Sequence, residues 1–297
     1  MFLRKLKSVI GEVFALRLKL DEMQVALGRI ESRQVEHGFD GFLHGAEFKV
    51  FSQWGEDGIL QAIIRTINPV SKIFIEFGVQ NYCESNTRFL LINNNWSGLV
   101  IDGSSDNINY IKNDPIYWRY NLKAECQFID RDNINSIFLR NGVQGEIGLL
   151  SIDIDGNDYW VWQSIDSVKP AIVVTEYNAR FGADRAVTVP YDQDFVRSEA
   201  HYSHIYYGAS LKALCQLGDS KGYAFVGCNS AGNNAFFVRR DLLKAPLREL
   251  SVAEGFILHK FREARDAEGQ LTFLSPEEES DLLFTLPLID VEHGVSE

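Results

Sequence analysis

The stretch Leu149–Asp158, LLSIDIDGND, constrains the fold of this chain more than any other part of the sequence. Apolar and polar residues alternate along it with the two-residue period of a β-strand, so that Asp153 and Asp155 share one face. Gly156 and Asn157 are expected to break the strand, and Asn157 or Asp158 to cap a following helix. Two carboxylates at a strand end are costly to desolvate unless they meet a cation, a hydroxyl or a proton in transit. We therefore predict that this stretch is the centre of an active site.

Short apolar runs and helical patterns alternate through the middle of the chain. Besides the opening stretch, strands are expected at residues 72–79, 97–102, 126–130 and 171–178. Such alternation predicts an α/β fold with a mainly parallel sheet and helices on both faces, closed by an antiparallel pair at 223–229 and 234–239. Acidic or amide side chains would then line one rim of the sheet: Asp102, Asp130, Asp153, Asp155, Glu176 and Asn178.

The first two strands have the outline of a nucleotide-binding βαβ unit. Glu76 lies in the first strand, Gly78 in the turn that follows, and Asp102 at the end of the second strand. Because that turn lacks the glycines of GxGxxG, NAD and FAD are disfavoured. A carboxylate at the end of the second strand can accept both hydroxyls of a ribose. The alternative for Asp102 is a solvated turn residue.

Composition narrows the class of partner. A net charge of −12 argues against general affinity for nucleic acid, which requires a basic surface. The four cysteines show neither zinc-binding nor disulfide spacing. The sequence has no apolar run long enough to span a membrane and no signal-peptide pattern. We expect a cytoplasmic protein, with attachment to the surface of the inner membrane as an option.

Residues 1–36 are predicted to form one long amphipathic helix. Apolar residues recur in it at steps of three and four, which suits a coiled-coil seam: Leu3, Leu6, Ile10, Val13, Leu16, Leu20, Met23, Leu27 and Ile30. Three roles are open for this helix: oligomerisation, docking on a partner or an anionic membrane surface, and packing on its own domain.

The rest of the chain is divided into a linker at 37–47, the main domain at 48–243 and an extension at 244–297. Within the main domain, residues 180–203 lack a clear period and are expected to form a long loop or lid over the site.

Seven motifs together carry a family resemblance. They are IEFGV, GLVIDGS, LLSIDIDGNDYW, VVTEYNA, VPYD, YYGASL and GYAFVGCNSAGNNAFFVRRDL. In these motifs, which fall within residues 48–243, the chain resembles the FkbM-like S-adenosylmethionine-dependent methyltransferases. The resemblance implies a Rossmann-like class I methyltransferase sheet of seven strands with an inserted antiparallel strand. It also implies that S-adenosylmethionine is the cofactor, and that the acceptor is a small molecule or a glycan.

The resemblance further implies where the cofactor would lie. Glu76, Gly78 and the following loop with Asn86 would hold the methionine part, Asp102 the ribose and Asp130 the adenine. Asp153 would face the sulfonium group and the incoming nucleophile. The turn at Gly78 departs from the family pattern, which is richer in glycine.

Two arrangements could help a poorly acidic sugar hydroxyl to lose its proton. In the first, which we expect, Asp153 or Asp155 is a general base, assisted by His201 or His204 from the lid. In the second, a divalent cation such as Mg²⁺ lowers the pKa of the hydroxyl, held by three oxygen ligands: Asp155, Glu176 and Asn178.

Two other functions compete with methyl transfer. A methyltransferase-like fold without activity could act as a scaffold in a glycan-assembly complex through its N-terminal helix. A glycosyltransferase could use an acid pair with a metal, but a DxD motif in a nucleotide-sugar context is missing.

Overall fold

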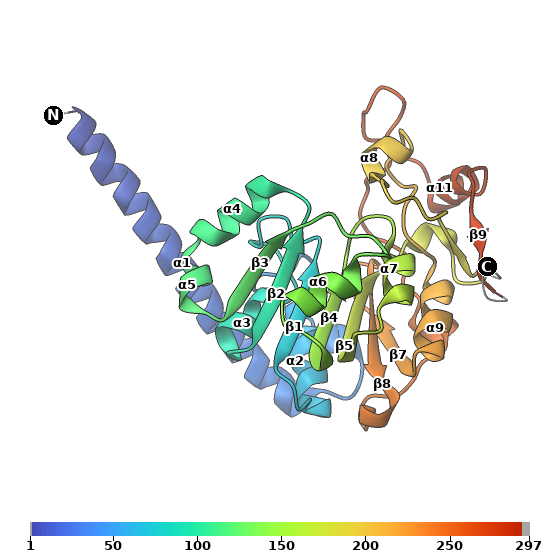
Figure 1. Ribbon diagram of the computed structural model, residues 1–297, viewed down its shortest axis with the longest axis horizontal. Helices are drawn as coiled ribbons and strands as arrows, with labels where there is room; N and C mark the ends of the chain where they lie inside the picture. Colours follow the sequence, from blue (N-terminus) through green and yellow to red (C-terminus); the bar gives the residue numbers. More distant parts are fainter. Residues whose placement is uncertain (1, 293–297) are drawn as a thin grey trace.

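The computed structural model describes residues 2–292, and its centre is a seven-stranded sheet (Figure 1). The strand order is β3-β2-β1-β4-β5-β8-β7. The strands from β3 to β5 in this order are parallel to one another, and β8 runs antiparallel to both β5 and β7. This order confirms the predicted Rossmann-like α/β sheet with one antiparallel strand inserted near its edge. The strands span β1 (Ile73–Phe77), β2 (Ser97–Asp102), β3 (Leu122–Cys126), β4 (Gly145–Ile152), β5 (Val168–Glu176), β7 (Tyr223–Cys228) and β8 (Asn234–Arg239).

Two strands differ from the prediction. Strand β3 ends where the sequence pattern placed its start, because Leu122 to Cys126 pair with β2 and residues 127–130 leave the sheet. Strand β4 ends at Ile152, so the two aspartates that follow do not share a strand face. Asp155 has a φ of +56°, a left-handed backbone that turns the chain away from the sheet.

Helices cover both faces of the sheet, as predicted. One apolar layer packs under α2 (Glu56–Ile67), α3 (Arg88–Asn93), α4 (Ser105–Asn113) and α5 (Pro115–Arg119). The other packs under α6 (Ile134–Arg140), α7 (Asp158–Ser164) and α9 (Leu211–Ser220). The carboxyl ends of the parallel strands therefore open on one edge of this sandwich, where the ligand crevice of such folds lies.

Helix α1 (Phe2–Gly38) is a single long helix, as expected, and its second half lies against α2 and α3 while its first half projects from the body (Figure 1). Gly28 makes the packing possible, because a Cβ there would lie 2.4 Å from a Val50 methyl carbon. No helix within residues 2–292 is long and apolar enough to cross a membrane.

Residues 240–292 pack back onto the body of the protein. Short elements punctuate them: η3 (Arg240–Leu242), α10 (Val252–Gly255), α11 (Pro276–Leu283) and β9 (Ile289–Asp290). Strand β9 pairs with β6 (Val187–Thr188), which lies inside the segment 180–203 that we call the lid. The lid also contains most of η2 (Ala179–Phe181) and α8 (Arg197–Ala200), and it rises above the edge where the parallel strands end (Figure 1). The C-terminal segment, residues 244–292, therefore helps to build the region above the sheet.

Candidate active site

Three carboxylates meet at the carboxyl ends of β4 and β5. Oxygen atoms of Asp153, Asp155 and Glu176 all lie within 4.8 Å of one another, and we call these residues the carboxylate trio. Asp153 is half-buried, Asp155 is exposed and Glu176 is buried. Among residues 2–292, Glu176 Oε2 is one of a few buried side-chain atoms that have no hydrogen-bond partner. A buried, unpartnered carboxylate oxygen facing two further acids is costly unless a proton or a cation joins them.

The cost of burying these negative charges raises the pKa values of two members of the trio. Removal from water raises the pKa of Asp153 well above its ordinary value, and the negative charges of Asp155 and Asp158 raise it further. Burial also raises the pKa of Glu176, with Asp153 and Asp155 as the next causes. Arg197 opposes both shifts. Carboxyl groups of this kind retain a proton at pH values where ordinary carboxyl groups have lost it, or they bind a cation instead.

Arg197 connects the lid to the trio. Its Nη1 donates to Asp155 Oδ1 at 2.5 Å, its Nη2 lies 2.6 Å from Glu263 Oε2, and its Nε donates to the carbonyl oxygen of His204 at 2.8 Å. The guanidinium carbon stacks 3.7 Å from the ring centroid of Tyr207. One side chain thus joins the loop after β4, the lid and the C-terminal segment.

A second arginine shares an acidic partner with the first. Arg180, almost fully buried, pairs with Glu263 at 2.9 Å and with Glu279 at 2.8 Å. His259 Nε2 lies 2.9 Å from the same Glu279 oxygen. The sequence pattern gave no signal for these partners, because they lie up to 99 residues apart in the chain.

The region around the trio has an excess of negative charge. Before His259 is counted, two guanidinium groups oppose six carboxylates, which leaves a formal charge of −4 when all are ionised: Asp153, Asp155, Asp158, Glu176, Glu263 and Glu279. A site with this balance favours a cationic ligand.

The acids of β1 and β2 hold the loops at the neighbouring part of the rim. Glu76 Oε1 accepts from the backbone N–H of Asn86 at 2.8 Å, and Asp102 Oδ2 accepts from that of Gln80 at 2.7 Å. Asp102 Oδ1 also accepts from the N–H of Ser104 at 2.8 Å. Both acids are therefore ordered, and Asp102 ties the end of β2 to the loop after β1.

Gly78 has a specific packing role in this loop. Its φ is +75°, and a Cβ at this position would lie 1.5 Å from the carbonyl oxygen of Asp153. The space that the glycine leaves is thus filled by the backbone of the loop after β4. Gly78 brings the loop after β1 into direct contact with the trio.

Asp130 and Asp158 stabilise turns. Asp130 Oδ1 accepts from the N–H groups of Asp132 and Asn133, both at 2.8 Å, which builds the entry to α6. Asp158 was expected to cap α7, but its carboxylate accepts from the N–H groups of Ile154 and Gly156, both at 2.9 Å. It therefore closes the turn that carries Asp155.

The other predicted site residues, Asn178, His201 and His204, form hydrogen bonds with groups outside the trio. Asn178 donates to the carbonyl oxygens of Ile205 and Tyr207 and accepts from the N–H of Arg180, so its amide organises the lid. His201 Nδ1 lies 2.7 Å from Ser203 Oγ, and burial lowers the pKa of its imidazole. His204 has a φ of +58° and contributes its carbonyl oxygen to Arg197. Within residues 2–292, neither imidazole forms a hydrogen bond with the carboxylate trio.

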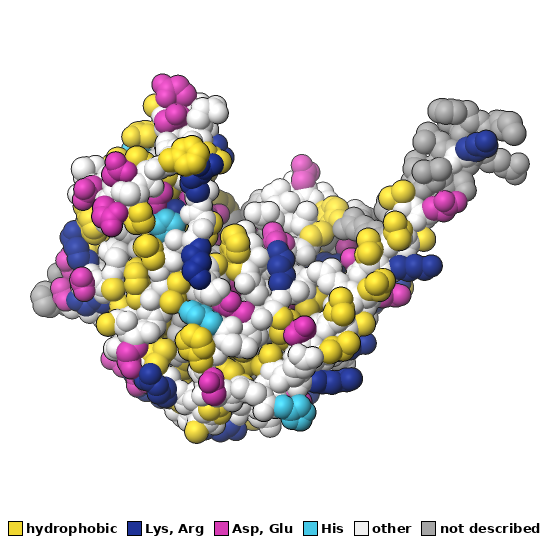
Figure 2. Space-filling view, turned by 180° about the vertical axis from the view of Figure 1, so that it is seen from behind, with side chains coloured by type: hydrophobic (Ala, Val, Ile, Leu, Met, Phe, Trp, Pro, Cys, Tyr) yellow, Lys and Arg dark blue, Asp and Glu magenta, His cyan; other side chains and the backbone are white. Residues whose placement is uncertain are grey.

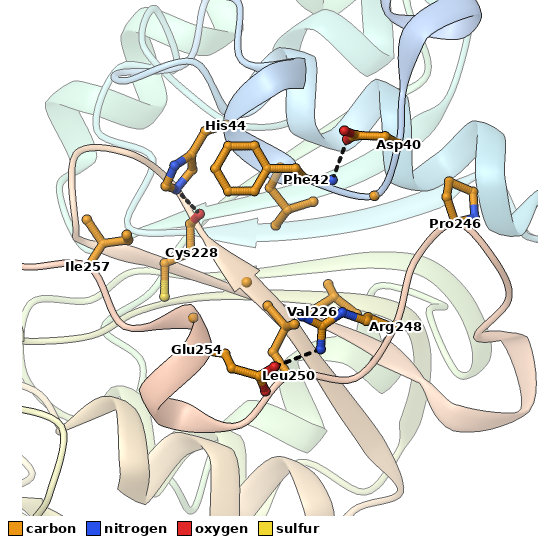
Figure 3. A pocket seen from close by; sticks show the side chains of 14 residues that line it. Asp40, Phe42, His44, Val226, Cys228, Pro246, Arg248, Leu250, Glu254 and Ile257 are labelled. Carbon is orange, nitrogen blue, oxygen red and sulfur yellow. Dashed lines mark hydrogen bonds and ion pairs between the residues drawn. The ribbon is translucent and has the colours of Figure 1, made fainter.

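A cavity of about 370 Å³ lies away from the trio, between residues 40–44, β7 and residues 246–257 (Figure 3). His44 Nε2 lies 3.1 Å from the carbonyl oxygen of Cys228 at one side, and Arg248 pairs with Glu254 at the other. None of the three acids lines this cavity.

Comparisons with known proteins give matches to solved structures alone. No protein-family model and no curated protein matches the chain. The N-terminal domain of EvdMO1 with SAH bound shares 10% identity over 62% of this chain and 79% of that chain, with a TM-score of 0.40. An S-adenosylmethionine-dependent methyltransferase from Clostridium acetobutylicum shares 11% over 59% and 87%, with a TM-score of 0.38. PKMT2 from Rickettsia typhi in complex with AdoHcy shares 8% over 65% and 54%, with a TM-score of 0.41.

Proposed function

We propose that this chain is an S-adenosylmethionine-dependent methyltransferase that methylates a hydroxyl group of a sugar or glycan-type acceptor. The observation that carries the proposal is the line of acids along one rim of a Rossmann-like sheet, from Asp102 at the end of β2 to the trio at β4 and β5. The residue types fit the cofactor, because its sulfonium and amino groups are cationic and its ribose presents two hydroxyls to an acceptor. The sequence resemblance to FkbM-like enzymes supports the same function.

The residues that would hold the cofactor lie at the first two strands. Asp102, only 8% exposed, is held at the crevice by Gln80 and Ser104 and would accept from the ribose hydroxyls. Glu76 orders the loop with Asn86 that would surround the methionine part. When bound, the cofactor supplies an electrophilic methyl group on a positively charged sulfur.

The trio would prepare the acceptor hydroxyl. A sugar hydroxyl is a weak acid, so the site must remove its proton or stabilise the alkoxide. Asp153, with its raised pKa, is a stronger base than an ordinary carboxylate. Arg197 fixes the loop that carries it by pairing with Asp155.

The donor set also fits a divalent cation, and this is the arrangement that we favour. Three carboxylates, one with an unpartnered oxygen, match the oxygen ligands that Mg²⁺ prefers. The ligands would be Asp153, Asp155 and Glu176, so Asp153 replaces Asn178 in the set expected from the sequence, since the amide of Asn178 is engaged in the lid. A cation here would act as a Lewis acid and lower the pKa of the acceptor hydroxyl.

Aromatic side chains near the lid support a sugar-type acceptor. Trp54, 40% exposed, stacks on Phe261 of the C-terminal segment with ring centroids 5.6 Å apart. The guanidinium group of Arg180 lies over the ring of Phe261, and Glu263, the partner of Arg180, also pairs with Arg197. Flat aromatic faces are suited to the apolar faces of sugar rings.

Calorimetric titration with S-adenosylhomocysteine tests the cofactor assignment. We expect binding by the wild type and a loss of at least tenfold in affinity in Asp102→Ala. Asp106→Ala, four residues further on and exposed, is the matched control and should bind like the wild type. Absence of binding by the folded wild type, or equal affinity in Asp102→Ala, would overturn the assignment and favour the scaffold. If binding is found, transfer of a labelled methyl group to sugar acceptors tests the acceptor class.

A further inference from the structure

Helix α1 carries an exposed apolar seam with coiled-coil spacing. Six side chains make up this seam, with exposed fractions between 49% and 61%: Val13, Leu16, Leu20, Met23, Leu27 and Ile30. Their sequence separations are 3, 4, 3, 4 and 3, which is the alternation of a and d positions in a heptad repeat. Apolar side chains in this number are not left on the surface of one helix without a partner.

The seam is distinct from the face that α1 presents to its own domain. Val25, Gly28 and Ser32 are buried against the body, where Arg65 bonds to Ser32 and Gly28 approaches Val50. The seam lies on another side of the helix, and Figure 2 shows hydrophobic side chains along the projecting part. Packing on its own domain, one of the three roles open from the sequence, therefore accounts for one face of α1 and leaves the seam uncovered.

The shape of the seam favours a helix as its partner. Its apolar stripe is narrow, because exposed charged side chains flank it. Lys19 lies at one edge of the stripe and Glu31 at the other. A membrane-bound amphipathic helix needs a wide apolar face and a basic polar face, whereas a two-in-seven stripe fits the matching stripe of another helix. Residues 13–31 include three basic and three acidic residues, so this part of the helix lacks the basic cluster that an anionic lipid surface attracts.

We propose that the seam binds the same seam of a second copy of this chain, so that the protein is a dimer joined through a two-helix coiled coil. Each copy brings a stripe of equal length and equal spacing, which the knobs-into-holes packing of such a coil requires. Burying six half-exposed side chains on each copy removes on the order of 1,200 Å² from water, within the range of specific interfaces. The partner also stabilises the projecting half of α1, because an isolated helical stretch of this length is marginal in water.

The test is the mass of the full chain in solution, measured by light scattering after size-exclusion chromatography. We expect the wild type to have twice the mass of the 33.7 kDa chain. Leu16→Glu places a charge in the seam of both copies and should shift the protein to the single-chain mass at micromolar concentration. Ala15→Glu adds the same charge at the neighbouring exposed position outside the seam and should leave the mass unchanged.

Circular dichroism and thermal unfolding show whether Leu16→Glu remains folded, which we expect because Leu16 is 57% exposed. A wild type with the mass of one chain, or a Leu16→Glu variant that keeps the doubled mass, overturns the proposal. Sedimentation of a single-chain wild type with vesicles of anionic phospholipid would assign the seam to a membrane surface instead. The proposal does not depend on the cofactor, so its failure is distinguishable from that of the methyltransferase assignment.

Discussion

Arg197 Nη1 lies 2.5 Å from Asp155 Oδ1, although 42 positions separate the two residues in the chain. The same guanidinium pairs with Glu263, so it is the connection between the acidic loop, the lid and the C-terminal segment. The pKa of this arginine is raised despite its burial, because the negative charges of Glu263, Glu176 and Asp155 favour its cationic form. Arg197 therefore stays cationic under all conditions in which the protein is folded.

Loss of this arginine should loosen the lid. In Arg197→Gln, Asp155 and the carbonyl oxygen of His204 lose the donor that Arg197 supplies, and Glu263 loses one of its partners. We expect limited proteolysis to cut within residues 192–204 roughly tenfold faster than in the wild type, which corresponds to about 1.4 kcal/mol of local stability. Arg185→Gln, an exposed arginine of the same lid, is the control and should be cut at the wild-type rate. Unchanged cleavage in Arg197→Gln would contradict the anchoring role.

Gly78→Ala should destabilise the protein through a clash between two backbones. The new Cβ would meet the carbonyl oxygen of Asp153 at 1.5 Å, and the φ of +75° adds strain of its own. Gly142 has the same φ, but a Cβ there meets nothing within 4 Å, so Gly142→Ala isolates the cost of the backbone angle. We expect urea unfolding to show a loss of about 1 kcal/mol in Gly142→Ala and roughly 3 kcal/mol or more in Gly78→Ala. An equal loss of unfolding free energy in the two variants would show that the loops after β1 and β4 can move apart without cost.

The contribution of Asp57 to the stability of the folded protein should fall as the pH rises above about 4. Burial raises the pKa of Asp57 to about 6, against the hydrogen bonds that it accepts from Ser52, Val50 and Phe51. Between its ordinary pKa and that value the folded state binds more protons than the unfolded state. The free energy of unfolding therefore decreases with rising pH, by about 3 kcal/mol for this one group.

Asp57→Asn removes this titration, so the slope of unfolding free energy between about pH 4 and 6 should be shallower than in the wild type. Asp158, whose pKa burial also raises to about 6, contributes in the same direction and remains in the variant. Urea unfolding at several pH values measures both slopes. Asp166→Asn, at an exposed position, should keep the wild-type slope. An identical slope in Asp57→Asn would contradict the assignment.

Divalent cations should stabilise the folded protein through the carboxylate trio. At a concentration of Mg²⁺ about 100 times its Kd, binding adds about 2.7 kcal/mol and raises the Tm by roughly 4 °C. Glu176→Gln should abolish most of this increase, whereas Asp166→Asn should retain it. A wild-type Tm that does not respond to Mg²⁺, Mn²⁺ or Ca²⁺ would leave the carboxylate base as the remaining arrangement.

The sheet and the meeting of the trio were predictable, because they follow from local rules. Alternation places strands, and parallel strands bring their carboxyl ends to one rim, so Asp153, Asp155 and Glu176 could be expected together. The error at β3 arose because Asp130 looks like an acid at a strand end. In fact, its carboxylate builds a turn four residues beyond the strand.

The surroundings of the trio could not be predicted from local patterns. Arg197 and Arg180 find their partners in the C-terminal segment, and neither Glu263 nor Glu279 lies in a recognisable motif. Asn178 was expected as a metal ligand because it follows Glu176 by two residues. Its direction is decided by the carbonyl oxygens of Ile205 and Tyr207, which lie just after the lid and come near only in the folded protein.

The contact between Gly78 and the carbonyl oxygen of Asp153 gives the rim an unusual mechanical property. The two loops touch backbone to backbone, with no side chain between them to rotate out of the way. A displacement of one loop toward the other therefore requires the second loop to move with it. A ligand bound beside β1 would then also fix the position of the acidic groups beside β4. The two halves of the site would move as one rigid unit.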